Sequence, residues 1–393
     1  MKQQFLLVLG VILGNLFAVV HPLFAQVWTL TGAPTNTAWM SVASSADGKK
    51  LAAVDFGGGR IYTSTNSGTT WTLQTNAPLR GWYSVASSAD GCKLVAATLI
   101  SDDRVYTSTN SGVTWMTNNV PVGNWRSTAS SADGTRLVVG GDGGLIYYST
   151  NAGGTWTASS APTANWWSIA ASADGTKLVG GGHGTGVGIY TSTNSGATWT
   201  LTGLPGFSWY SVASSADGMQ LVAASASPSR IYTSTDSAAT WTWQSNAPAT
   251  SWRTVASSAD GTKLVAGSAT QSPIYTSTDS GATWTTNNIP IAAYFGVASS
   301  ADGCRLFAGA MPGNLYSSQT IPTPELNVTS SNGNLNLAWI VPSTDFVLQQ
   351  NPDLTRANWT DVPDAPTLDL IHLQNQVILP SSGSNGFYRL KTP

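Results

Sequence analysis

The carboxylates that could perform acid–base chemistry lie in irregular stretches between regularly recurring segments of the chain. These candidates are Asp55, Asp102, Asp103 and Asp142. Two carboxylates about 6.5–9.5 Å apart across a groove can hydrolyse a glycosidic bond with inversion, one as acid and the other as base. Asp103 and Asp142 would be the catalytic pair in that case. Acids at loop tips are more often solvated, and we expect that of these four side chains.

Other kinds of catalytic site have less support. His183 and His372 are the histidines beyond the first 25 residues, and no cluster of metal-ligand residues surrounds either of them. We expect His183 to be a loop residue. The glycine-rich strings lack the lysine and the helix of a phosphate-binding loop. The sequence therefore predicts no metal site and no cofactor.

Internal repeats organise most of the chain. A phrase of the form W-x-S-V-A-S-S-A-D-G recurs with its Asp at positions 47, 90, 133, 174, 217, 260 and 302. A second phrase, I-Y-T-S-T-N-S-G-x-T-W-T, recurs with its Trp at 71, 115, 156, 199, 241 and 284. Each repeat offers four short runs rich in β-branched and aromatic residues, separated by turn residues. In the second repeat these runs are 83–87, 94–98, 104–109 and 114–117.

Four strands in about 42 residues make one blade of a β-propeller. Seven first phrases predict seven blades, but the seventh blade stops near Ser318 without its final Trp-Thr strand. Trp28 lies 43 residues before Trp71, so residues 27–30 are in register to supply that strand. We expect the N-terminal strand to complete the last blade and close the ring, which removes open sheet edges.

One position beside the repeated tryptophan changes from blade to blade. First strands line the channel of a propeller, so these side chains should surround its mouth on the face that carries the variable loops. Aromatic and arginine side chains suit a polar, planar ligand such as a sugar or a peptide, although they could instead fill the gaps between blades. The residues are Met40, Tyr83, Arg126, Trp167, Tyr210, Arg253 and Phe295, and all except Met40 are our candidate ligand-binding residues.

Composition and the N-terminus point to export. Lys2 precedes an apolar run from Phe5 to Val20 and a small residue, Ala25, as in a secretory signal peptide. Charged residues make up only 9% and the formal net charge is −2, so nucleic acid is not an expected partner. Cys92 and Cys304 occupy equivalent turns of separated blades, beyond the roughly 7 Å limit for a disulfide, and should be free or buried thiols. We expect a secreted or cell-surface protein with no membrane span after cleavage.

The second phrase resembles the Asp-box, or BNR, motif S-x-D-x-G-x-x-W. Ser64 to Trp71 is one example, with Asn66 in place of the Asp. The resemblance covers roughly residues 27–320 and implies a propeller of the kind found in sialidases and in photosystem II assembly factors, the latter being binding proteins. Sialidase chemistry needs a glutamate and an F/Y-R-I-P string, whereas the only glutamate of this chain is Glu325. Because these residues are missing, we do not expect sialidase activity.

The repeat period ends at a Pro-rich linker, residues 321–325, after which residues 326–393 alternate in the manner of a small β-sandwich. This tail resembles those of secreted bacterial proteins, which implies attachment or sorting at the cell surface; a stabilising cap is the alternative. We predict an all-β protein with a signal peptide (1–25), a seven-bladed propeller (26–320), the linker and the sandwich. A non-catalytic propeller that binds a glycan or an extracellular protein is the favoured function, and a glycoside hydrolase is the alternative.

Overall fold

The computed structural model describes residues 26–99, 104–184, 187–320, 325–331, 333–341, 346–353, 355–380 and 386–391. The predicted signal peptide, most of the predicted linker, and Asp102 and Asp103 lie outside these ranges. Every regular element in the described ranges is a β-strand, and none of these residues forms a helix long and apolar enough to span a membrane.

Seven four-stranded antiparallel sheets form between residues 26 and 320 of the described chain, one for each predicted blade. The innermost strands are β2 (Trp39–Ser44), β6 (Trp82–Ser87), β10 (Trp125–Ser130), β14 (Asn165–Ala171), β18 (Ser208–Ser214), β22 (Trp252–Ser257) and β26 (Tyr294–Ser299). The second strands are β3 (Leu51–Asp55), β7 (Leu94–Thr98), β11 (Leu137–Gly141), β15 (Leu178–His183), β19 (Leu221–Ser227), β23 (Leu264–Ser268) and β27 (Arg305–Ala310). The third strands are β4 (Arg60–Ser64), β8 (Val105–Ser108), β12 (Tyr147–Ser149), β16 (Ile189–Ser192), β20 (Ser229–Ser234), β24 (Tyr275–Ser277) and β28 (Leu315–Gln319). The outermost strands are β5 (Thr72–Leu73), β9 (Met116–Thr117), β13 (Thr157–Ala158), β17 (Thr200–Leu201), β21 (Thr242–Trp243), β25 (Thr285–Thr286) and, in the last blade, β1 (Trp28–Leu30).

The N-terminal strand closes the ring, as the repeat register predicts. Strand β1 pairs antiparallel with β28, with Trp28 opposite Ser318 and Leu30 opposite Tyr316. The order of the last sheet is β1-β28-β27-β26, and β26 packs against β2 of the first blade. One blade is therefore built from both ends of the propeller, and the outer side of β28 is paired with β1.

The repeated phrases become turns and core contacts. In the first blade, Ser64 Oγ accepts the Gly68 N–H at 3.0 Å and Asn66 Oδ1 accepts the Thr70 N–H at 2.9 Å. Gly68 has φ +85°, in the left-handed region that favours glycine. The buried Trp39 meets Tyr62 edge to face at 5.5 Å and also packs beside Trp71 at 6.4 Å. The repeated tryptophans are thus structural, because they fill the space within and between blades.

Two faces of the propeller follow from this connectivity. The turns between first and second strands and between third and fourth strands lie on one face, here called the turn face. The loops between second and third strands and the links between blades lie on the other, here called the loop face. Ser45, in the first turn, bonds the Asp47 carboxylate, which accepts the Lys49 N–H at 2.9 Å. The turn face is therefore repetitive in structure as well as in sequence.

A closed circle of backbone hydrogen bonds joins all seven blades at the turn face. One alanine of each blade donates its N–H to the carbonyl of the corresponding alanine in the next blade, at 2.7–2.8 Å. The circle runs Ala46 to Ala89, Ala132, Ala173, Ala216, Ala259, Ala301 and back to Ala46. The bond from Ala301 to Ala46 spans the closure point, so the circle has no gap.

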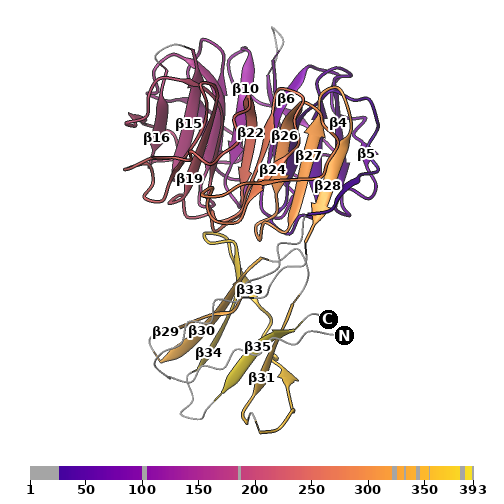
Figure 1. Ribbon diagram of the computed structural model, residues 1–393, viewed down its shortest axis with the longest axis vertical. Coiled ribbons are helices and arrows are strands. Elements are labelled where there is room, and N and C mark those ends of the chain that lie inside the picture. The colour runs from indigo at the N-terminus through magenta and orange to yellow at the C-terminus, as the bar shows by residue number, and fades with distance from the viewer. Residues whose placement is uncertain are drawn as a thin grey trace.

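The C-terminal region, residues 325–391, forms two further sheets. One has the order β29-β30-β34-β33 and the other β32-β31-β35, and Figure 1 shows both beneath the propeller. Their strands are β29 (Asn327–Ser331), β30 (Asn334–Ile340), β31 (Val347–Asn351), β32 (Thr360–Asp361), β33 (Thr367–Asp369), β34 (Gln374–Pro380) and β35 (Phe387–Lys391). Leu337, Trp339, Leu348, Val377 and Leu390 form the buried core between them, as in a small sandwich.

Candidate functional site

A β-bulge in the innermost strand of every blade positions the predicted ring at the channel mouth. In each pairing of a first strand with a second strand, the register shifts immediately after the repeated aromatic residue. The residue that has no partner in the strand pairing is the predicted ring residue, for example Met40 between Trp39 and Ser41. A bulge redirects the side chain of its extra residue. We call the seven skipped residues (Met40, Tyr83, Arg126, Trp167, Tyr210, Arg253 and Phe295) the inner ring.

Arg253 brings most of the inner ring together. Its guanidinium carbon lies 5.0–5.9 Å from the ring centroids of four aromatic residues. Arg253 Nη2 donates to Tyr83 Oη at 2.7 Å and approaches Met40 Sδ at 4.0 Å. The residue is only 8% exposed. The four aromatic residues are Tyr83, Trp167, Tyr210 and Phe295. The predicted set is therefore one connected cluster across the channel mouth.

The second arginine of the ring has an acidic partner. Arg126 Nε donates to Asp142 Oδ1, and Arg126 Nη1 donates to Tyr83 Oη at 2.9 Å. Trp167 Nε1 donates to the same Asp142 oxygen at 3.3 Å. The Arg126 guanidinium also lies 4.6 Å from the Trp167 ring centroid. Asp142 thus fixes both Arg126 and Trp167, whereas no carboxylate in the described part of the chain forms an ion pair with Arg253.

His183 belongs to the site, contrary to its expected place in a loop. It is the last residue of β15, and its imidazole stacks on the Trp167 ring with centroids 3.9 Å apart and planes 9° apart. Burial lowers the pKa of His183 below its ordinary value, and the nearby guanidinium of Arg126 lowers it further. The lowered pKa favours the neutral imidazole, and the charged side chains of this cluster among the described residues are Arg126, Arg253 and Asp142.

His183 and Asp142 are members of a second ring that the sequence analysis missed. In every blade, the repeated aromatic residue pairs with a residue of the second strand. The residue directly after that partner lies sixteen positions after the inner-ring residue and belongs to the second ring. Asp142, His183 and Phe56 contact the inner ring, and the Phe56 ring centroid lies 6.2 Å from that of Tyr83. Met311 packs against the hydrophobic cluster that contains Met40. The full set is Phe56, Leu99, Asp142, His183, Ala226, Ala269 and Met311. We call the inner ring together with Phe56, Asp142 and His183 the platform.

The expectation that the loop acids are solvated is wrong for two of them. The Asp142 side chain is only 25% exposed because it is bound to Arg126 and Trp167. Asp55 is the last residue of β3, not a loop residue, and is 6% exposed. Its Oδ1 has no hydrogen-bond partner. Asp103, the other half of the hydrolase alternative, lies outside the described residues, so the spacing of that pair stays a prediction.

Metal ligands and thiols add no chemistry to the platform. Within the described ranges, no three His, Cys, Asp or Glu side chains gather as a metal site would require. Cys92 and Cys304 are both free thiols, as the sequence predicts. Burial raises the pKa of the Cys304 thiol, and the charge of Asp302 raises it further. The arrangement at the loop face is suited to holding a ligand by charge and hydrogen bonds.

Comparisons with solved structures identify the architecture. YCF48 from Cyanidioschyzon merolae superposes with a TM-score of 0.58 at 15% identity, over 75% of this chain and 99% of that one. The chain has the β-propeller fold. A structure of YCF48 bound to a D1 peptide matches with a TM-score of 0.57 at 16% identity, over 75% of this chain and 97% of the other. No protein-family model and no curated protein matches the sequence.

Proposed function

We propose that this protein is a non-catalytic binding propeller that captures a segment of another protein on the platform, through a carboxylate of that segment. The observation that carries the proposal is Arg253. Its guanidinium is buried and has Tyr83 Oη and Met40 Sδ as its hydrogen-bond acceptors among the described residues. A buried cation without an anionic partner is electrostatically incomplete, and a ligand carboxylate can form the strong, bidentate pair that a guanidinium favours.

The environment of the aromatic rings favours a protein segment over a glycan. A sugar binds by stacking on an open aromatic face, but the Trp167 ring already contacts the His183 imidazole and the Arg126 guanidinium. Tyr83 likewise has Arg126 at 5.1 Å and Arg253 at 5.9 Å from its ring centroid. The solved propeller of similar fold that is bound to a D1 peptide gives an example of a peptide ligand. The two guanidiniums and the carboxylate of the platform are suited to a charged, extended chain.

The setting of this function is an extracellular or cell-surface one. The N-terminal sequence has the features of a signal peptide, and only 9% of the residues are charged. We also assign the repeated S-x-D/N-x-G-x-x-W turns to the Asp-box type, because their Ser and Asn side chains accept backbone N–H groups. An Asp-box scaffold carries many functions, so the proposed role depends on the platform alone.

A binding screen with matched charge variants tests the proposal. Residues 26–393 would be screened against an array of acidic and neutral peptides and against a glycan array. Acidic peptides should bind, and salt should weaken the binding less than for an exposed ion pair, because Arg253 is buried. Arg253→Gln should reduce the affinity by about tenfold or more, since one charge-assisted pair contributes about 1.5–3 kcal/mol.

The control for that screen is Arg60→Gln, which removes the same charge from an exposed residue at the start of β4. Equal losses in both variants would mean that affinity follows net charge and not the platform. Binding of glycans without peptides would identify a lectin. Release of reducing sugar that disappears in Asp142→Asn would instead establish the hydrolase alternative.

A further inference from the structure

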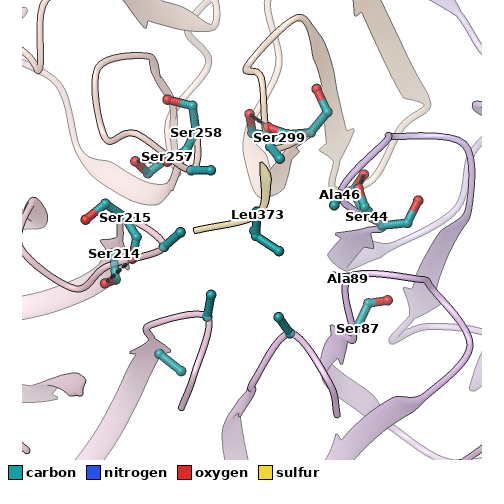
Figure 2. Close-up of a pocket in the computed structure, with 18 of the residues that line it drawn as sticks. Ser44, Ala46, Ser87, Ala89, Ser214, Ser215, Ser257, Ser258, Ser299 and Leu373 are labelled. Atoms are coloured by element: carbon teal, nitrogen blue, oxygen red, sulfur yellow. Dashed lines mark hydrogen bonds between the residues drawn. The ribbon is translucent and has the colours of Figure 1, made fainter. Parts of the chain in front are cut away.

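The turn face has a socket on the axis of the propeller. Seven equivalent alanines, those of the closed hydrogen-bond circle, line a cavity of about 150 Å³ together with the serines that precede them. Ala132, Ala173 and Ala216 are buried there, 7–8% exposed, and pack with Ala89, Ala259 and one residue from outside the propeller. That residue is Leu373 of the C-terminal region, and Figure 2 shows its side chain in the middle of the ring.

The turn that carries Leu373 is held in shape by its own hydrogen bonds. It connects β33 and β34, and the Asp369 carboxylate accepts the N–H of Ile371 at 2.8 Å and of His372 at 3.3 Å. The Leu373 carbonyl accepts the Val341 N–H at 2.8 Å. Leu373 itself has φ +52°, a left-handed conformation that is uncommon for a leucine. The conformation of this turn is therefore held by hydrogen bonds within the C-terminal region itself.

We propose that the alanine ring is a docking socket for the C-terminal region of the same chain, and that Leu373 is the side chain that enters it. The partner surfaces match in chemistry, because a branched aliphatic group meets a circle of methyl groups. Burial of such a group removes apolar surface from water, which favours the docked state. The contact lies on the turn face, and the platform lies on the opposite face.

The connection between the two parts favours docking within one chain. Strand β28 ends at Gln319, and the Thr320 N–H donates to the Cys304 carbonyl in a turn next to the socket. Strand β29 begins at Asn327, so a short segment reaches the C-terminal region from the same face. A residue spans at most about 3.3–3.6 Å, which keeps the tip at a high effective concentration near the socket.

The symmetry of the socket limits what this contact can fix. The seven alanines are equivalent, so the contact of Leu373 with them centres the C-terminal region on the axis without selecting one rotation about it. If that region carries the predicted surface attachment, the docked arrangement presents the platform away from the surface.

Small-angle X-ray scattering of residues 26–393 tests the socket. Leu373→Asp would place a charge among the alanine methyl groups and should shift the docking equilibrium on the order of tenfold to a hundredfold toward release. The radius of gyration should then increase. Ile371→Asp is the matched control, because Ile371 lies in the same turn but is 52% exposed. Its scattering should equal that of the unaltered protein.

A reciprocal variant and a mass measurement complete the test. Ala216→Leu would fill the socket from the propeller side and should also release the tip. The unfolding temperature of the propeller in Leu373→Asp should stay unchanged, since the residue lies outside the blades. Identical scattering for the unaltered protein and Leu373→Asp would overturn the proposal. A dimer that Leu373→Asp converts to a monomer would also overturn it, because the socket would then hold the tip of a second copy.

Discussion

Arg253 and Tyr83 join non-adjacent blades of the propeller: Arg253 Nη2 donates to Tyr83 Oη at 2.7 Å although the residues are 170 positions apart. Arg126 donates to the same oxygen from the blade that follows Tyr83. One phenolic oxygen thus accepts hydrogen bonds from both arginines of the platform. This shared acceptor connects three blades on the side of the channel opposite the alanine circle.

Removing the shared acceptor should destabilise the propeller. Tyr83→Phe leaves two guanidinium donors without this partner, and we expect the free energy of unfolding to fall by about 1–2 kcal/mol. Urea unfolding followed by tryptophan fluorescence measures it. Tyr210→Phe is the control, because no hydrogen bond of Tyr210 Oη is found in the described part of the structure. Equal losses in the two variants would show that the phenolic oxygen of Tyr83 has no special role.

Stability should depend on pH through His183. Its pKa is lowered in the folded state, so between that value and the ordinary value near 6.5 the unfolded chain binds more protons than the folded one. The stabilising contribution is therefore fully present above pH 6.5 and is lost as the pH falls below it. Urea unfolding from pH 8 to pH 5 should show this slope.

Two histidine variants test whether His183 causes this pH dependence of the free energy of unfolding. His183→Gln should remove it, because no group beside Trp167 then gains a proton. His372→Gln should retain it, since His372 lies in the C-terminal region and not beside Trp167. A slope that survives in His183→Gln would place its origin in another group.

The N-terminal strand should be needed for a stable ring. Trp28 is 9% exposed and packs with the buried core of the last blades. Trp28→Ala should lower the free energy of unfolding by about 3–5 kcal/mol, as expected for a buried tryptophan. Leu30→Ala, in the same strand but 54% exposed, should change it by less than about 0.5 kcal/mol. Thermal and urea unfolding of both variants provide the comparison, and a small effect of Trp28→Ala would mean that closure depends on other contacts.

The alanine circle should protect its amides from hydrogen exchange equally in all blades. Each alanine N–H is bonded to the next blade, including Ala301 to Ala46 at the closure point. Such amides exchange only when blades separate. Mass spectrometry of short peptides that contain each alanine would compare the rates. Faster exchange at Ala46 and Ala301 than at Ala173 would show that the ring opens at its seam.

Much of the fold follows from the repeat alone. The position of Trp28 relative to Trp71 predicts the closing strand, and the structure confirms that β1 pairs with β28. Strand lengths are less exact: the fourth run of the second blade is two residues, Met116–Thr117, instead of four. That strand pairs with only one neighbour and follows a turn held by side-chain hydrogen bonds. The residue types alone do not show where the turn ends and the strand begins.

The sequence predicts the inner ring of the site but not the second ring. The inner ring was found because one position varies beside a repeated tryptophan, although the pattern could not show that Arg253 reaches across the channel. The second ring has a constant offset of sixteen residues that was present in the sequence. The glycines around Asp142 and His183 are typical of loops, whereas in the structure Asp142 directly follows β11 and His183 is the last residue of β15. The contact of Leu373 with the alanine ring has no repeat to reveal it.

The alanine circle also differs in kind from the hydrogen-bonded ladders of other folds. An α-helix leaves four N–H groups and four carbonyls without partners at its ends, and it frays there. The circle has as many donors as acceptors and no terminus, so none of its N–H groups or carbonyls is left without a partner. Its bonds point in one rotational sense, so their components in the plane of the ring sum to nearly zero. Every blade therefore has a hydrogen-bonded neighbour on both sides in this circle, although the polypeptide itself has two ends.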